Sequence, residues 1–194
     1  MIEIEAKIQV DDLDLVRQRL KESGAGFIGC YAQSNHILDR PDGSLRKQGC
    51  GLRVRTVKTI QGREAPATLT FKGPAQESSV KRREEIQLDI TDADKLLQVL
   101  EAIGFETVLT YAKRRESWSL ERCRVELDEV PLLGTFVEIE GPSERDIHSV
   151  RQRVELADET HIERSYVGML WDRCRELGRS TIGIDFVEHS EERD

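Results

Sequence analysis

The chain has 194 residues, 38% of them apolar and 34% charged, with a formal net charge of −8 at pH 7. This length favours a single domain, and the acidic balance argues against a general nucleic-acid binder, which needs a basic surface. No apolar run approaches the length of a membrane span, and the first residues lack the apolar core of a signal peptide, so we expect a cytoplasmic protein without membrane association. Four widely spaced cysteines predict reduced thiols rather than disulfides or a zinc site.

The first half of the chain predicts mainly strands. Residues 2–7 alternate apolar and charged side chains, as a strand does, whereas residues 11–24 have the apolar spacing, the capping aspartate and the terminal glycine of a helix. Further extended segments, separated by turn sequences that include RPDGS and by a polar loop at 73–79, are expected at 27–39, 50–60, 66–74 and 80–90.

The second half predicts strands flanked by helices. Helices are expected at 91–104, from Ser143 to about 157, and at 166–177. Strands are expected at 106–120, 122–129 and 134–140. The last helix should bury Val167, Leu170 and Trp171. Many hairpin-connected strands with a few helices predict an antiparallel sheet or a closed barrel with peripheral helices.

The predicted strands share one unusual feature, which is an ordered row of charged or polar side chains on alternate residues. Because strand side chains alternate between two faces, residues two positions apart lie on the same face. The rows, in chain order, are Glu3, Glu5 and Lys7; Arg53 and Arg55; Thr68, Thr70 and Lys72; Lys81, Arg83, Glu85 and Gln87; Lys113 and Arg115; Arg124, Glu126 and Asp128; and Glu138 and Glu140.

Two interpretations account for these rows. A half-exposed antiparallel sheet also alternates apolar and polar residues, with its charged face in water. Alternatively, the strands form a barrel whose interior is charged and whose apolar faces point outward under helices. Arginine pairs on one sheet face repel each other unless anions lie between them, which favours the second interpretation.

A charged interior of this kind suits one class of ligand. Arginine and lysine side chains that converge from several strands match the oxygens of a polyphosphate. Glutamate pairs and an aspartate are oxygen ligands for a hard divalent cation such as Mg²⁺ or Mn²⁺. Cations and a metal together would stabilise the charge that develops during phosphoryl transfer.

In this order, the charged rows resemble the CYTH family, also called triphosphate tunnel metalloenzymes. The resemblance begins with the ExExK at Glu3, Glu5 and Lys7, continues through LRVR, TFK, an R-x-E, a K-x-R and ELDEVP, and closes with the ExE at Glu138 and Glu140. It covers about residues 1–142, and the segments YAKRRESW, LDEVPLLGTFVEIEGP and SYVGML look most like class IV adenylyl cyclases. In the second strand, where many such cyclases carry an aromatic residue, this chain reads SNHILD.

The resemblance implies an α+β fold with an eight-stranded antiparallel β-barrel, a tunnel with a charged interior, and peripheral helices. A single domain is then expected at 1–187, with tunnel strands at about 1–142, C-terminal helices at about 143–178 and a disordered tail at 188–194. Trp118 and Trp171 are expected to be packing residues, and no role is assigned to the histidines.

The resemblance also implies a role for each charged side chain. The metal-binding residues would be Glu3, Glu5, Asp128, Glu138 and Glu140. The triphosphate would be held by Lys7, Arg53, Arg55, Lys72, Arg83, Lys113, Arg115 and Arg124. Catalytic roles would fall to Lys7, Lys113, Arg115 and Asp128, supported by Glu85 and Glu126.

Three functions share this set of residues. The first is an adenylate cyclase that converts ATP to 3′,5′-cyclic AMP and pyrophosphate with Mg²⁺ or Mn²⁺, and it is favoured by the cyclase-like later segments. The second is a hydrolase of tripolyphosphate, thiamine triphosphate or a nucleoside triphosphate. The third is a polyphosphate-binding module without catalysis. In each case the ligand is a nucleoside triphosphate or inorganic polyphosphate rather than nucleic acid, and the chain is a monomer or a homodimer.

Overall fold

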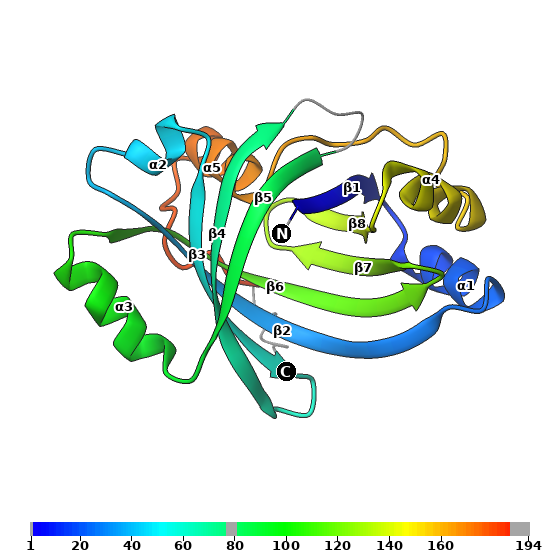
Figure 1. Ribbon diagram of the computed structural model, residues 1–194, viewed down its shortest axis with the longest axis horizontal. Coiled ribbons are helices and arrows are strands. Elements are labelled where there is room, and N and C mark those ends of the chain that lie inside the picture. Colours follow the sequence, from blue (N-terminus) through cyan, green and yellow to red (C-terminus); the bar gives the residue numbers. More distant parts are fainter. Residues whose placement is uncertain (1, 77–80, 187–194) are drawn as a thin grey trace, which may run out of the picture.

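Eight antiparallel strands close into a barrel in the computed structural model, which describes residues 2–76 and 81–186. The strands are β1 (Ile2–Val10), β2 (Gly26–Asp39), β3 (Gly51–Thr59), β4 (Glu64–Gln76), β5 (Lys81–Ile90), β6 (Glu106–Leu120), β7 (Cys123–Val130) and β8 (Gly134–Glu140). Around the barrel they follow the order β1-β5-β4-β3-β2-β6-β7-β8 (Figure 1). The predicted closed barrel is confirmed.

Five helices surround the barrel. They are α1 (Leu13–Glu22), α2 (Ser44–Lys47), α3 (Ala93–Ala102), α4 (Glu144–Arg153) and α5 (Tyr166–Leu177). The side chains of Asp12, Asp92, Ser143 and Ser165 cap the N-termini of four of them, as their short polar side chains favour. None of the helices within residues 2–76 and 81–186 is both long enough and apolar enough to cross a membrane.

Two local features differ from the expected elements. The helix α2 was expected only as part of a turn, and it is held by Asp39, whose carboxylate accepts hydrogen bonds from the backbone N–H groups of Leu45 and Arg46 at 2.9 and 3.1 Å. Strand β4 continues to Gln76, so the polar loop expected from residue 73 begins later. The rest of that loop and the tail expected at 188–194 lie outside the described residues.

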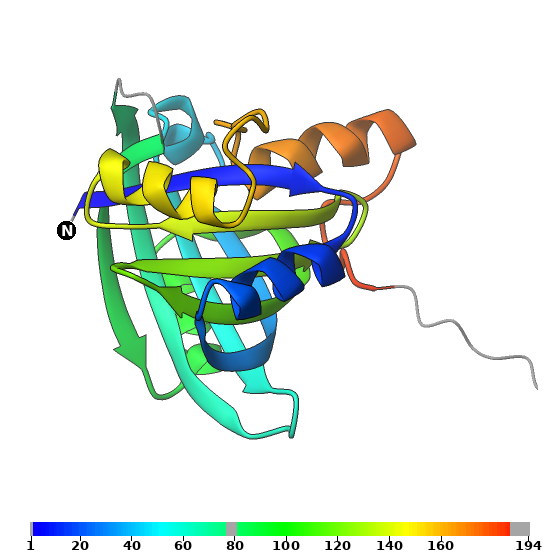
Figure 2. The same cartoon turned by 90° about the vertical axis from the view of Figure 1, so that its right-hand side faces the viewer.

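Helices α1 and α4 cover the outer face of β1, β7 and β8 (Figure 2). Val16 and Leu20 of α1 and Ile147 and Val150 of α4 are buried against the apolar residues of these strands, which alternate with the charged ones. Helix α3 lies over β3 through Leu100. The expected arrangement of outward apolar faces under helices therefore holds for these strands.

Strand β5 is the exception to this arrangement. Its outward residues Ile86 and Leu88 are 53% and 55% exposed, although the alternation predicts a covered apolar face. Helix α3 follows β5 directly in the chain but packs over β3 instead. The face of β5 that points away from the tunnel is therefore partly in contact with solvent.

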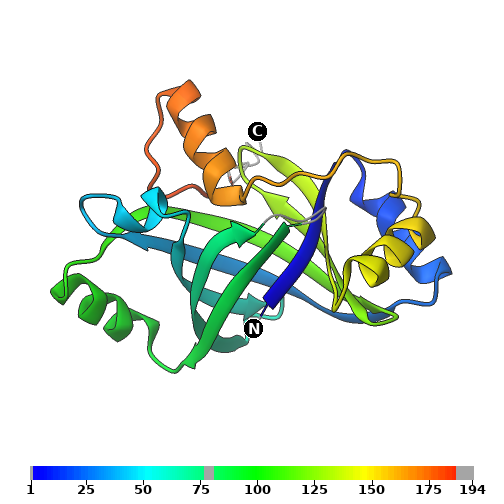
Figure 3. The same ribbon diagram turned by 45° about the horizontal axis from the view of Figure 1, so that its top comes forward.

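Helix α5 (Figure 3) packs against buried residues of β2, β6, β7 and β8. Its buried residues are Tyr166, Leu170 and Cys174, whereas Val167 and Trp171, expected to be buried, are only half-buried. Facing it are Ile37, Leu109, Tyr111 and Phe136, which have the same strand parity as the charged residues farther along these strands. We call this group, with the three buried residues of α5, the apolar plug.

Candidate active site

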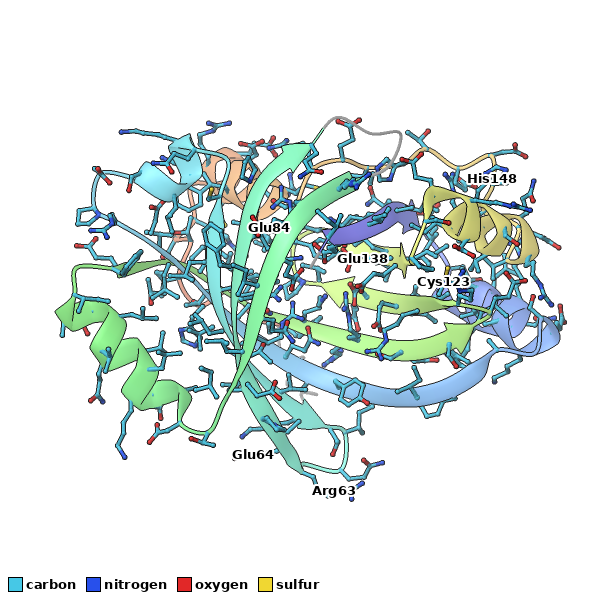
Figure 4. All side chains as sticks on the ribbon, viewed as in Figure 1. Arg63, Glu64, Glu84, Cys123, Glu138 and His148 are labelled. Atoms are coloured by element: carbon cyan, nitrogen blue, oxygen red, sulfur yellow. The ribbon has the colours of Figure 1, made fainter. Side chains whose placement is uncertain are left out.

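Most of the described side chains of the charged rows line the interior of the barrel. A cavity of about 1590 Å³ runs through it, larger than the roughly 300–1,000 Å³ of a typical small-molecule site. Fourteen of the sequence-predicted residues line this cavity: Glu3, Glu5, Lys7, Arg53, Arg55, Lys72, Arg83, Glu85, Lys113, Arg115, Arg124, Glu126, Glu138 and Glu140. Figure 4 shows Glu138 on β8, far from the tip of the β3–β4 hairpin marked by Arg63 and Glu64.

Strand register gathers the acidic residues on neighbouring strands. Glu5 of β1 lies opposite Glu140 of β8, and Glu138 lies opposite Glu126 of β7. Burial raises the pKa of the Glu140 carboxyl, and repulsion by Glu3, Glu5 and Glu85 raises it further. Four carboxylates therefore lie close enough to disfavour one another's charge, which a bound cation would relieve.

Two of these carboxylates, those of Glu3 and Glu85, contact the ammonium of Lys72. This ammonium donates to both carboxylate oxygens of Glu3 at 2.6 Å and lies 3.0 Å from an oxygen of Glu85. Burial alone would raise the pKa of Glu85, but Lys72 and Arg53 hold it below its usual value. The two glutamates and the lysine thus form a single ion cluster across β1, β4 and β5.

Asp128 lies beneath the cavity lining and is fully buried. Arg115 donates to its two oxygens at 2.7 and 2.6 Å, Lys113 donates at 2.9 Å, and the hydroxyl of Tyr166 donates at 3.0 Å. Because four hydrogen bonds converge on this carboxylate, its position fixes both basic side chains. Its role as a metal ligand or a catalytic group stays a prediction.

The two cations on Asp128 have different proton affinities. Burial and repulsion by Arg115 lower the pKa of Lys113 to about 7, against the attraction of Asp128 and Glu138. Burial also lowers the pKa of Arg115, but Asp128, Glu126 and Glu138 outweigh it, so the guanidinium stays charged. Lys113 is therefore the basic residue whose charge an anionic ligand would change most.

Three half-buried arginines on β3 and β5 line the cavity. The Nε atoms of Arg53 and Arg83 are buried and make no hydrogen bond among the described residues. Arg55 donates to Asn35 at 2.8 Å, and its pKa is lowered by burial and by repulsion from Arg53 and Arg115. Guanidinium groups that have unsatisfied N–H groups, or that lie near other cations, are suited to hold an anion.

Lys7 is held by a segment that sequence reasoning did not connect with the site. Its ammonium donates to the carbonyl of Arg164 at 3.0 Å and lies 3.4 Å from Glu138 and 4.1 Å from the ring centre of Tyr166. Its backbone N–H donates to Nδ1 of His161 at 3.2 Å. The segment between α4 and α5 therefore positions this lysine through both its backbone and its side chain.

Tyr166 is thus a site residue that the sequence analysis missed, although it stands in the segment SYVGML that was singled out. Its ring lies beneath two ammonium groups, and burial raises the pKa of its phenol well above the usual value, as do Glu138 and Asp128. A buried hydroxyl in an otherwise apolar helical stripe was the available indication, since such groups need a hydrogen-bond acceptor. Arg124, by contrast, lies at the rim, with a side chain 58% exposed.

A family model for the CYTH domain matches residues 1–166. The chain belongs to the CYTH family. It is 30% identical over 159 residues to a protein of Methanocaldococcus jannaschii named "putative adenylate cyclase", covering 82% of this chain and 85% of that one.

Several solved structures have the same fold as this chain. A protein of Pyrococcus horikoshii superposes with a TM-score of 0.77 at 27% identity, covering 88% of this chain and 99% of that one. A protein of Hippeastrum, named an adenylyl cyclase and reported to have a dominant triphosphatase activity, superposes with a TM-score of 0.64 at 16% identity over 92% of this chain and 96% of that one. At that identity the Hippeastrum protein supports the fold alone.

Proposed function

We propose that this CYTH protein is a divalent-metal-dependent adenylate cyclase that converts ATP to 3′,5′-cyclic AMP and pyrophosphate. The observation that carries the proposal is the set of buried or half-buried lysines and arginines that line one cavity from β1, β3, β4, β5 and β6. Such a set recognises a triphosphate, and the match to the Methanocaldococcus protein favours the cyclase over other members of the family.

In this reaction the ribose 3′-oxygen forms a bond to the α-phosphorus and the hydroxyl proton is released. The bond from that phosphorus to the bridging oxygen breaks, and pyrophosphate leaves. Arg53, Arg55 and Arg83 hold the phosphates, and Lys113 and Arg115, fixed by Asp128, stabilise the charge on the departing group. The enzyme's main contribution is to bring the hydroxyl rather than water into line with the α-phosphorus.

We propose Mg²⁺ or Mn²⁺ as the cofactor, held by Glu3, Glu5 and Glu140. The chemistry of the donors fits, because carboxylate oxygens suit a hard cation and the pKa of Glu140 is raised by its acidic neighbours. Within residues 2–76 and 81–186 no three such side chains are already arranged as ligands, since Glu3, for example, is held by Lys72. A bound metal would lower the pKa of the attacking hydroxyl and neutralise phosphoryl charge.

Hydrolysis of a triphosphate is the second candidate function. The same residues would hold tripolyphosphate or a nucleoside triphosphate while water attacks the terminal phosphorus. The cavity lining would bind the triphosphate in the same way in both reactions, so this candidate is included in the test.

The test incubates the purified protein with ATP or tripolyphosphate and Mg²⁺ or Mn²⁺, and separates the products. Cyclic AMP with an equal amount of pyrophosphate supports the cyclase. Orthophosphate from tripolyphosphate without cyclic AMP from ATP supports the hydrolase, and binding without turnover of either compound contradicts both.

One matched pair of variants tests the acidic set. Glu3→Ala should reduce metal-dependent turnover at least about 100-fold. It removes one of the proposed ligands of the metal, which would stabilise the negative charge on the reacting phosphoryl group. Glu84→Ala removes an acid from the outward face of the neighbouring strand β5 and should leave turnover unchanged. Comparable activity in the two variants would contradict the placement of the metal.

A further inference from the structure

The cavity does not end at the charged residues. It continues to the connection between β2 and β3, where Arg40, Asp42 and Arg46 line it, and to the exposed side of α5, where Trp171 lines it. This part lies next to the apolar plug and carries aromatic and aliphatic surface, including Ile37 and Val108. Inorganic triphosphate has no group that would make use of such a surface.

Trp171 and Arg46 form a stacked pair in this region. The guanidinium carbon of Arg46 lies 4.8 Å from the ring centre of Trp171. Arg46 is exposed and belongs to the four-residue helix α2, whereas Trp171 is half-buried on α5. A fixed aromatic ring with a movable cation above it can accept a flat heterocycle between the two.

The phosphate-binding residues and Trp171 lie in one cavity. Tyr166, which lies under Lys7 and Lys113, is on the same helix as Trp171, and both residues line the cavity. Five residues place Trp171 about 7.5 Å farther along the axis of α5 and turn its side chain by about 140° around the helix. Phosphates near Tyr166 and a base at Trp171 would therefore occupy two parts of the same cavity, which the ribose of a nucleoside triphosphate would connect.

We propose that Trp171 and Arg46 form the nucleobase site of this cavity, with the base stacked on the indole ring and covered by the guanidinium. The inference rests on the proposed function in requiring a nucleotide ligand, but it does not depend on which phosphorus is attacked. Because every base has a π-face, stacking favours nucleotides over inorganic polyphosphate without choosing strongly among bases. It also gives Trp171 a role beyond packing.

Binding of ATP and of tripolyphosphate, measured by calorimetry in parallel, tests the site. Trp171→Ala should raise the Kd for ATP roughly tenfold, as expected for the loss of one stacked base, and the Kd for tripolyphosphate less than about twofold. Trp171→Phe keeps an aromatic face and should restore most of the ATP affinity. Equal effects of Trp171→Ala on the two ligands, or none on ATP, would overturn the proposal.

Arg46→Ala supplies a second test that does not disturb the core, because this side chain is exposed. Arg40→Ala is the matched control, since Arg40 lines the same cavity and stacks on a different ring, that of Phe105, at 4.8 Å. Arg46→Ala should weaken ATP binding several-fold more than tripolyphosphate binding, whereas Arg40→Ala should affect the two ligands equally. The same selectivity in both variants would overturn the proposal.

Tryptophan fluorescence gives an independent readout. Trp118 is 4% exposed and its indole N–H donates to Glu116, so a change in emission on ligand binding should come from Trp171. ATP should change the emission, tripolyphosphate should not, and the ATP response should disappear in Trp171→Phe. A response that persists in that variant would overturn the proposal. Loss of cyclic AMP formation with these binding results intact would contradict the cyclase but not the nucleobase site.

Discussion

The charged part of the tunnel and the apolar plug are built from the same strands. On β6 the inward residues change from Leu109 and Tyr111 to Lys113 and Arg115, and on β8 they change from Phe136 to Glu138. In the plug each side chain gains free energy by leaving water. In the charged part each buried ion loses its hydration and needs a partner, so it contributes specificity for a ligand rather than stability.

The largest effect on stability is expected when the charge of Asp128 is removed. Asp128→Asn keeps the volume but removes the buried carboxylate that Lys113 and Arg115 share, which leaves Arg115 with Glu126 and Glu138 as its buried counter-ions. It should lower the free energy of unfolding by about 3–5 kcal/mol. Urea unfolding followed by circular dichroism measures it.

Glu129→Gln on the same strand is the control. It breaks an exposed ion pair with Arg114 at 3.3 Å and should cost no more than about 1 kcal/mol. If the two variants were equally stable, the buried ions would not depend on Asp128 as the geometry indicates.

A substitution in the apolar plug should lower stability without changing ligand affinity. Leu170→Ala removes a fully buried side chain and should destabilise the protein by about 2–5 kcal/mol through the cavity that it leaves. Because Leu170 belongs to the apolar cluster and does not line the cavity, the Kd for tripolyphosphate of the folded protein should stay within about twofold. A large loss of affinity at unchanged stability would show that the two parts are not separable in this way.

The smallest expected effect is the pH dependence of ligand binding that arises from the protonation of Lys113. Its pKa of about 7 means that the side chain is mostly neutral at pH 8, and a bound triphosphate favours the charged form and raises this pKa. Binding at pH 8 should therefore take up as much as one proton, and affinity should fall as pH rises above about 7. Calorimetry in buffers of different ionisation enthalpy measures the uptake, which should vanish in Lys113→Met.

The sequence predicted more of the charged part than of the plug. Strand alternation placed Arg53, Arg83 and Glu138 in the interior because parity is a local property. It could not show that Leu109 and Phe136, on that same parity, face a helix rather than ligand. The roles of Tyr166 and His161 depend on where the chain after β8 returns, which is a tertiary contact and leaves no periodicity to read.

The secondary-structure elements also divide into those that the local sequence predicts and those that depend on tertiary contacts. The spacing of apolar residues predicted 106–120 and 166–177 with the bounds that β6 and α5 have. Helix α2 was missed because four residues carry too little periodicity, and its helical form depends on the carboxylate of Asp39. The uncovered face of β5 was missed because alternation says which residues share a face but not what covers it.

The pairing of β1 with β8 and β5 has a consequence for the order of folding. Glu5 meets Glu140 across strands from opposite ends of the barrel sequence, and within the described residues β1 pairs with β5 from Ile2 to Glu5. Such long loops close late, because their entropy is lost before the contacts form. We therefore expect the acidic set to assemble late, so that during refolding the return of metal-dependent turnover lags behind the return of secondary structure.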